Sequence, residues 1–112
     1  MQVKSFAIWA NAEKEQVPAL VQSTIKWAND NNLEVYLADR LKSIDVDLEV
    51  SYFSSQNPPE VDFLLCFGGD GTLISGVRIF SDPSVPVLGV HLGGLGFLAQ
   101  ITPEVLIDKL ES

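Results

Sequence analysis

The chain has few basic residues, one cysteine and no long apolar segment. Its 112 residues include 7 Lys and Arg against 15 Asp and Glu, which gives a formal net charge of −8. So acidic a protein lacks the positive surface that binds nucleic acid or an anionic membrane. The single Cys66 cannot form an internal disulfide, and we expect it in the core. Without a membrane-spanning run or a basic N-terminal leader, we expect a cytoplasmic protein.

Two common nucleotide-binding fingerprints are also missing. The sequence has no Walker A lysine loop and no G-x-G-x-x-G, and it shows no internal repeats or low-complexity tracts. What it does have is the composition of an ordinary globule, with 46% apolar and 20% charged residues. A length of 112 residues predicts a single domain with a real core.

The apolar pattern predicts alternating strands and helices. Residues 16–31 carry apolar side chains at helical spacing, with Pro18 in the first turn and Asn31 near the end. The segment 54–60 contains Pro58-Pro59 and is predicted to be a linker. Strands are predicted at 3–10, 33–37, 61–67 and 85–91, and helices at 16–31, 38–43, 72–80 and from 102 onward. The alternating segment 44–53 fits either a strand with one wet face or an ordered loop. This order predicts an α/β fold, an open and mainly parallel sheet flanked by helices.

The most informative segment is residues 67–73, FGGDGTL, which joins a predicted strand to a predicted helix. Glycines at such a turn let a ligand approach the backbone, and the outward-facing amides attract phosphate. Asp70 would repel phosphate, so its presence indicates a general base or a metal ligand, as in phosphoryl transfer. The alternative is a purely structural turn in which Asp70 caps the helix.

A second glycine-rich turn, residues 91–96, follows the predicted strand at 85–91. Because parallel strands end at one edge of the sheet, we expect the two turns to build one site. His91 has no second His or Cys partner in the sequence, which favours a structural role over a metal site. Arg78 could face phosphate, although a solvated or ion-paired arginine is the commoner outcome. Trp9 and Trp27 are expected in the core or an interface.

Taken together, these motifs resemble the NAD kinase family. Residues 67–73 resemble its GGDGT signature, and residues 86–99, PVLGVHLGGLGFLA, resemble its second block. The resemblance implies a Rossmann-like N-terminal domain of the type shared with 6-phosphofructokinase. It also implies transfer of the γ-phosphate of ATP, or of polyphosphate, to the 2′-hydroxyl of the adenosine ribose of NAD, giving NADP. A divalent metal, most simply Mg²⁺, is implied as the cofactor.

The resemblance also assigns roles to residues. Asp70 falls on the catalytic aspartate of the family, and Phe97 falls on an aromatic residue that lies against adenine. The implied nucleotide-binding residues are Gly68, Gly69, Asp70, Gly71, Thr72, Ile74 and Phe97. Ser75 stands where many bacterial members have a basic residue, so Arg78, about one helical turn on, is a candidate replacement. His91 stands where the family usually has Asn.

The Asn-Glu motif and the β-rich C-terminal region of the family do not occur in these residues. The resemblance therefore implies that 1–112 is the N-terminal α/β domain carrying the GGDGT loop, inactive alone and part of a dimer or tetramer when complete. Two alternatives stay open. One is a lipid kinase domain of the diacylglycerol or sphingosine type, which shares the GGDGT loop. The other is a non-catalytic α/β binding module in which Asp70 is only a cap.

Overall fold

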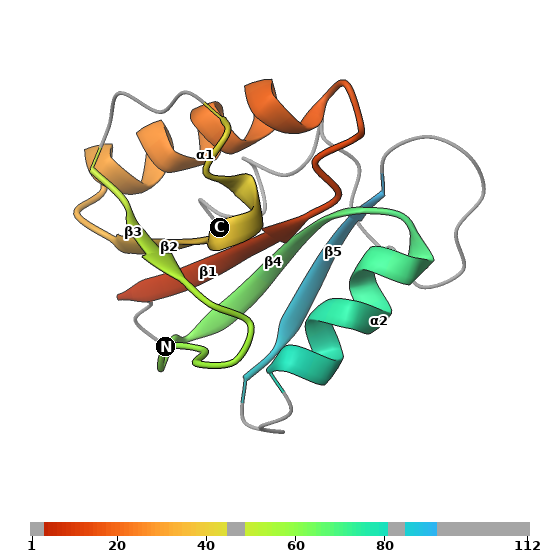
Figure 1. Cartoon of the computed structure of the whole chain (residues 1–112). Coiled ribbons are helices and arrows are strands. Elements are labelled where there is room, and N and C mark those ends of the chain that lie inside the picture. The colour runs from red at the N-terminus through yellow and green to blue at the C-terminus, as the bar shows by residue number, and fades with distance from the viewer. Residues whose placement is uncertain (1–3, 45–48, 81–84, 92–112) are drawn as a thin grey trace.

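The computed structural model describes residues 4–44, 49–80 and 85–91, and it forms a layered α/β domain (Figure 1). All five strands are parallel and run in the order β3-β2-β1-β4-β5. No helix within these ranges is long and apolar enough to cross a membrane. The elements are β1 (Ser5–Ala10), α1 (Val17–Asp30), β2 (Glu34–Ala38), the 3₁₀ turn η1 (Asp39–Leu41), β3 (Ser51–Phe53), β4 (Phe63–Gly68), α2 (Asp70–Ile79) and β5 (Val87–His91).

The two helices cover opposite faces of the sheet (Figure 1). Phe6 of β1 lies against Trp27 of α1, with ring centroids 6.4 Å apart. Trp9, three positions later and so on the other face, lies beneath Gly76 of α2. Covered on both sides, β1 and β4 are almost entirely buried. This explains why both strands are continuous apolar runs without alternation.

Helix α1 ends through a motif that the sequence only hints at. Asn32 adopts φ 58°, a left-handed conformation that Asn tolerates better than most residues. Its N–H donates to Asn29 O at 3.2 Å, and the N–H of Leu33 donates to Ala28 O at 2.8 Å. This pair of bonds is the Schellman arrangement, which satisfies the last carbonyls of a helix.

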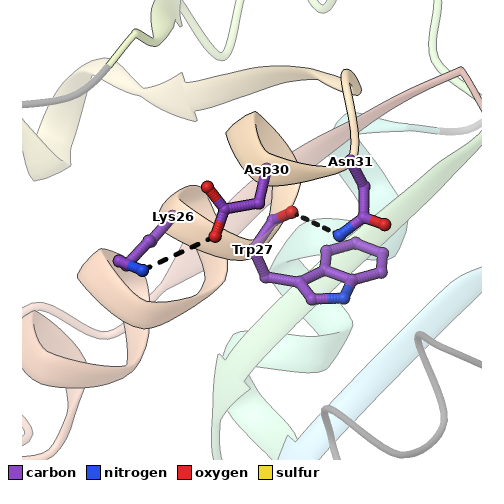
Figure 2. A network of polar contacts seen from close by, with 4 residues as sticks. All are labelled: Lys26, Trp27, Asp30 and Asn31. Carbon is purple, nitrogen blue, oxygen red and sulfur yellow. Dashed lines mark hydrogen bonds and ion pairs between the residues drawn. The ribbon is translucent and has the colours of Figure 1, made fainter.

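Side chains complete that end of α1 (Figure 2). The Asn31 side-chain amide donates to Trp27 O at 2.8 Å, and Lys26 forms an ion pair with Asp30 at 3.5 Å. Both members of the ion pair are largely exposed, so the pair contributes little to stability. The helix therefore ends where the sequence predicted, and its chain turns directly into β2.

The predicted strands and helices are largely confirmed, with three changes. Helix α2 begins at Asp70, two residues before its predicted start, so Gly71 lies inside its first turn. The predicted short helix at 38–43 is the single 3₁₀ turn η1. Within 44–53, strand β3 covers only Ser51–Phe53, while residues 45–48 lie outside the described part of the chain. The predicted final helix also lies outside it.

Asp62 joins the segment before β4 to the start of β1, at the amino-terminal edge of the sheet. Its carboxylate accepts hydrogen bonds from the N–H groups of Lys4, at 2.7 Å, and Ser5, at 3.1 Å. These two donors, Lys4 first, hold the pKa of Asp62 below its ordinary value. The stabilisation is therefore present above the unfolded pKa and is lost as pH falls through the lower folded pKa.

We therefore expect Asp62→Asn to be less stable than the wild type at pH 6–7. The difference should shrink as pH drops below about 4, because protonation then weakens the wild-type contact too. Urea unfolding at a series of pH values measures this difference. A difference that stays constant down to pH 2.5 would show that the charge of Asp62 does not matter.

Candidate active site

The strand order reverses between β1 and β4. From β1 the chain proceeds to β2 on one side, and from β4 it proceeds to β5 on the other. Open α/β sheets bind ligands outside the carboxyl ends of their strands, at such a switch point. Here the loop after β1 is fastened to the end of β4, because the N–H of Asn11 donates to Phe67 O at 3.0 Å. The Asn11 side chain accepts from the N–H of Glu13 at 3.1 Å, which holds that loop in a turn.

The glycine-rich turn after β4 lies at this switch point. Gly68 is the last residue of β4, Gly69 is the N-cap of α2, and Asp70 is the first residue of the helix. The first intrahelical bond runs from the N–H of Leu73 to Gly69 O at 3.2 Å. The preceding N–H groups have no partner within the helix and carry its positive dipole end, which is a favourable place for phosphate. Since Gly69 is the N-cap, the structure does not place Asp70 at the capping position.

The glycines of this region fall into two kinds. Gly68 has φ +156°, and a Cβ there would lie 2.5 Å from Thr72 Oγ1, so the fold itself requires glycine. Gly69 and Gly71 have nothing within 4 Å of a would-be Cβ, and neither has a positive φ. Gly71 also lowers helix stability relative to Ala. Packing therefore does not account for Gly69 and Gly71, whereas a ligand close to the backbone does.

The other predicted residues of α2 separate along the helix. Thr72 lies in the first turn, with its side chain against Gly68. Ile74 is 45% exposed, one turn from Asp70. Arg78 is in the last turn, eight residues and about 12 Å along the axis from Asp70. Ser75 lies between them, one turn before Arg78, so a contact from Arg78 to a phosphate near Asp70 would depend on its long side chain reaching back along the helix.

The second glycine-rich turn and Phe97 lie outside the described residues. The structure does show where the chain leaves β5, because His91 is the register partner of Gly68 in the parallel pair β4·β5. The two predicted turns thus begin at neighbouring positions on one edge of the sheet. The expectation that both turns start at the same edge of the sheet is therefore confirmed.

The other candidate groups of the described residues add no ligand or catalytic group to the glycine turn. Cys66 is buried as expected, and its burial raises the thiol pKa to about 12, so it is not a thiolate at neutral pH. Among residues 4–44, 49–80 and 85–91, no three His, Cys, Asp or Glu side chains gather into a metal site. Two open hollows lie at the amino ends of the strands, around Glu34 and around Asp62, and neither includes the glycine turn.

One residue at the switch point was not predicted from the sequence. Asn11 was not among the predicted site residues, yet its backbone joins the first loop to Phe67 at the switch point. The available signal was its position, since it immediately follows the first strand of a predicted parallel sheet.

Comparison with known proteins supplies the family. Residues 6–112 match the family described as ATP-NAD kinase N-terminal domain. The chain belongs to the NAD kinase family. A protein of Syntrophotalea carbinolica named NAD kinase is 37% identical over 109 residues, covering 97% of this chain and 38% of that protein. A Sulfurimonas denitrificans NAD kinase is 55% identical over 53 residues, covering 47% of this chain and 17% of that protein.

The fold of this NAD kinase family member also matches a solved structure. The yeast NADH kinase, crystallised in complex with NADH, superposes with a TM-score of 0.78 at 20% identity, over 97% of this chain and 35% of that one. This agreement confirms the predicted α/β fold. The chain spans about two fifths of the length of the Syntrophotalea relative.

Proposed function

We propose that this chain is the N-terminal domain of an enzyme that phosphorylates NAD to NADP. The transferred group is the γ-phosphate of ATP, or a phosphate of polyphosphate, and the acceptor is the 2′-hydroxyl of the adenosine ribose. The observation that carries the proposal is the position of Asp70. It is the first residue of α2 at the switch point of the sheet, between two glycines whose surroundings are open. Family membership supports the same reaction.

In this proposal Asp70 accepts the proton of the 2′-hydroxyl as that oxygen attacks phosphorus. Phosphoryl transfer depends mostly on positioning and charge stabilisation, so the remaining groups bind and orient. The free amides around Gly69 and Gly71 hold phosphate oxygens, while Thr72, Ile74 and Phe97 lie against the nucleotide. Mg²⁺ commonly binds through one or two carboxylates plus substrate phosphates. A single carboxylate at Asp70 fits that mode, in which the metal neutralises phosphate charge.

The chain length relative to its relatives leads to the next part of the proposal. The matched NAD kinases are more than twice as long, so we propose that the rest of such a protein completes the nucleotide site. We further propose that the complete enzyme is cytoplasmic and forms a dimer or tetramer. Residues 1–112 alone should then have no measurable kinase activity.

The test is Mg²⁺-dependent formation of NADP from NAD by the full-length protein and by 1–112, side by side. ATP and polyphosphate are offered separately to identify the donor. Activity in the full-length protein alone is the expected result. Turnover by 1–112 would show that the domain is sufficient, and activity in neither would reject NAD as the acceptor.

The lipid kinase alternative is tested in the same assay with diacylglycerol and sphingosine as acceptors. A lipid kinase needs an apolar or basic face toward the membrane, and the net charge of −8 argues against one. Phosphorylation of a lipid, with none of NAD, would reverse our assignment.

A further inference from the structure

Phosphoryl transfer needs positive charge near the phosphates, and the backbone of Arg78 lies about 12 Å along α2 from Asp70. The described part of the chain offers few other cations. Lys4 precedes β1 and lies at the amino-terminal edge of the sheet, beside Asp62. Lys26 is near the end of α1 and is paired with Asp30. None of these three cations lies at the edge where Gly68 and Asp70 are found.

Three cations follow the carboxyl ends of β1 and β2, and they differ in their neighbours. Lys14 stands between two exposed acids, Glu13 and Glu15, so its segment has a net negative charge. Lys42 forms an ion pair with Asp39 at 3.5 Å. Arg40, between them in η1, has no carboxylate within ion-pair distance among the residues that the structure describes. Its charge is therefore the least compensated of the three.

Arg40 is also held in a defined orientation. Its guanidinium carbon lies 4.8 Å from the centroid of the Trp9 ring, a cation–π contact. Trp9 is 7% exposed and is packed under Gly76 of α2, so the ring is a fixed platform. A guanidinium held over a ring by such a contact can still donate through its N–H groups, in the fork that matches phosphate oxygens. Arg40 itself is exposed to solvent.

This platform is close to the glycine turn. Trp9 is the register partner of Cys66, and Gly68 follows Cys66 by two residues. The platform is therefore roughly 7 Å below the level of Gly68 along the strands. A triphosphate or a dinucleotide bound at the switch point can span that separation. Building on the proposed function, we propose that Arg40, oriented by Trp9, binds a phosphate group of a nucleotide substrate.

The test compares Arg40→Gln with Lys42→Gln in the full-length protein. Lys42 is a matched control, because it lies two residues away, carries the same charge and also contacts an aromatic ring, that of Tyr52 at 5.5 Å. We expect Arg40→Gln to raise one substrate KM about tenfold, equivalent to about 1.4 kcal/mol. Both substrate KM values of Lys42→Gln should stay within about twofold of those of the wild type. Arg40→Lys keeps the charge but loses the forked pair of donors. Its KM should therefore lie between those of Arg40→Gln and Lys42→Gln.

The two nucleotides are told apart by separate titrations. A raised KM for ATP with an unchanged KM for NAD places a donor phosphate at Arg40, and the converse places the pyrophosphate of NAD there. Equal KM values in Arg40→Gln and Lys42→Gln overturn the proposal and leave Arg40 as a cover for Trp9. If Arg40→Gln does not fold, Arg40→Lys with wild-type KM values overturns it as well. A wild-type protein that phosphorylates no NAD is a failure of the proposed function instead.

Discussion

Replacing Asp70 with Asn should lower kcat for NAD phosphorylation by at least ~100-fold, the lower end for the loss of a positioned general base. The amide has nearly the same shape but cannot accept the proton of the 2′-hydroxyl. The turn that presents the residue is fixed by Gly68 and the N-cap Gly69, so its backbone should not change. The KM for NAD should therefore change much less than kcat, which steady-state kinetics of the full-length protein will measure.

Two companion variants make this result specific. Asp62→Asn removes a carboxylate at the opposite edge of the sheet and should leave kcat near wild type at neutral pH. Asp70→Ser keeps a small polar residue at the first position of the helix but removes the carboxylate. If Asp70 mattered only for the helix start, Asp70→Ser would be fully active. Wild-type kcat in Asp70→Asn would end its assignment as the base.

The largest effect on stability is expected from Gly76→Ala. A Cβ at this position would lie 2.6 Å from Cys66 Sγ and 3.1 Å from Leu64 Cδ2, both on strand β4. Such overpacking costs about 1–3 kcal/mol, and helix propensity returns at most about 1 kcal/mol. We expect a net loss of about 1 kcal/mol, or roughly 5 °C in Tm, measured by thermal and urea unfolding.

Gly71→Ala is the matched control, since it makes the same change in the same helix where nothing lies within 4 Å. It should raise stability by up to about 1 kcal/mol, because Ala favours the helix. Cys66→Ala combined with Gly76→Ala should recover much of the loss by removing the sulfur. If the coupling free energy between Cys66→Ala and Gly76→Ala is below about 0.5 kcal/mol, the contact with the sulfur is not the cause of the lost stability.

The fold was predictable because its signals are local and strong. The continuous apolar runs of β1 and β4 reflect burial on both faces, and Pro18 and Asn31 mark the two ends of α1. The start of α2 was placed two residues late, because glycines at 69 and 71 look like a turn whether or not the backbone is helical. Residues 44–53 alternate as a strand would, yet among the described residues 44 and 49–53 the strand β3 covers Ser51–Phe53 alone. Edge pairing depends on the neighbouring strand β2, which sequence alternation does not reveal.

The position of the glycine turn between β4 and α2 was predictable from the sequence, whereas the residues around it were not. Asp70 and its glycines are contiguous in sequence, so a motif reveals them. Arg78 was a candidate for a phosphate contact because it is close to Asp70 in sequence, and the structure shows that the helix separates their backbones by about 12 Å along its axis. Arg40 and Trp9 are 31 positions apart and meet only because β1 and β2 are parallel neighbours. A long-range pair of this kind leaves no local pattern to read.

The opposite placement of the two tryptophans has a practical consequence. Trp9 faces α2 and carries Arg40, whereas Trp27 belongs to α1 and contacts Phe6 on the other face. The indole N–H of each is buried and finds no acceptor among the described residues. The chain therefore contains two tryptophan fluorophores, one on each side of the sheet. With Trp27 replaced by Phe, all tryptophan emission comes from Trp9, which contacts Arg40. A change in that emission then reports on the surroundings of Arg40.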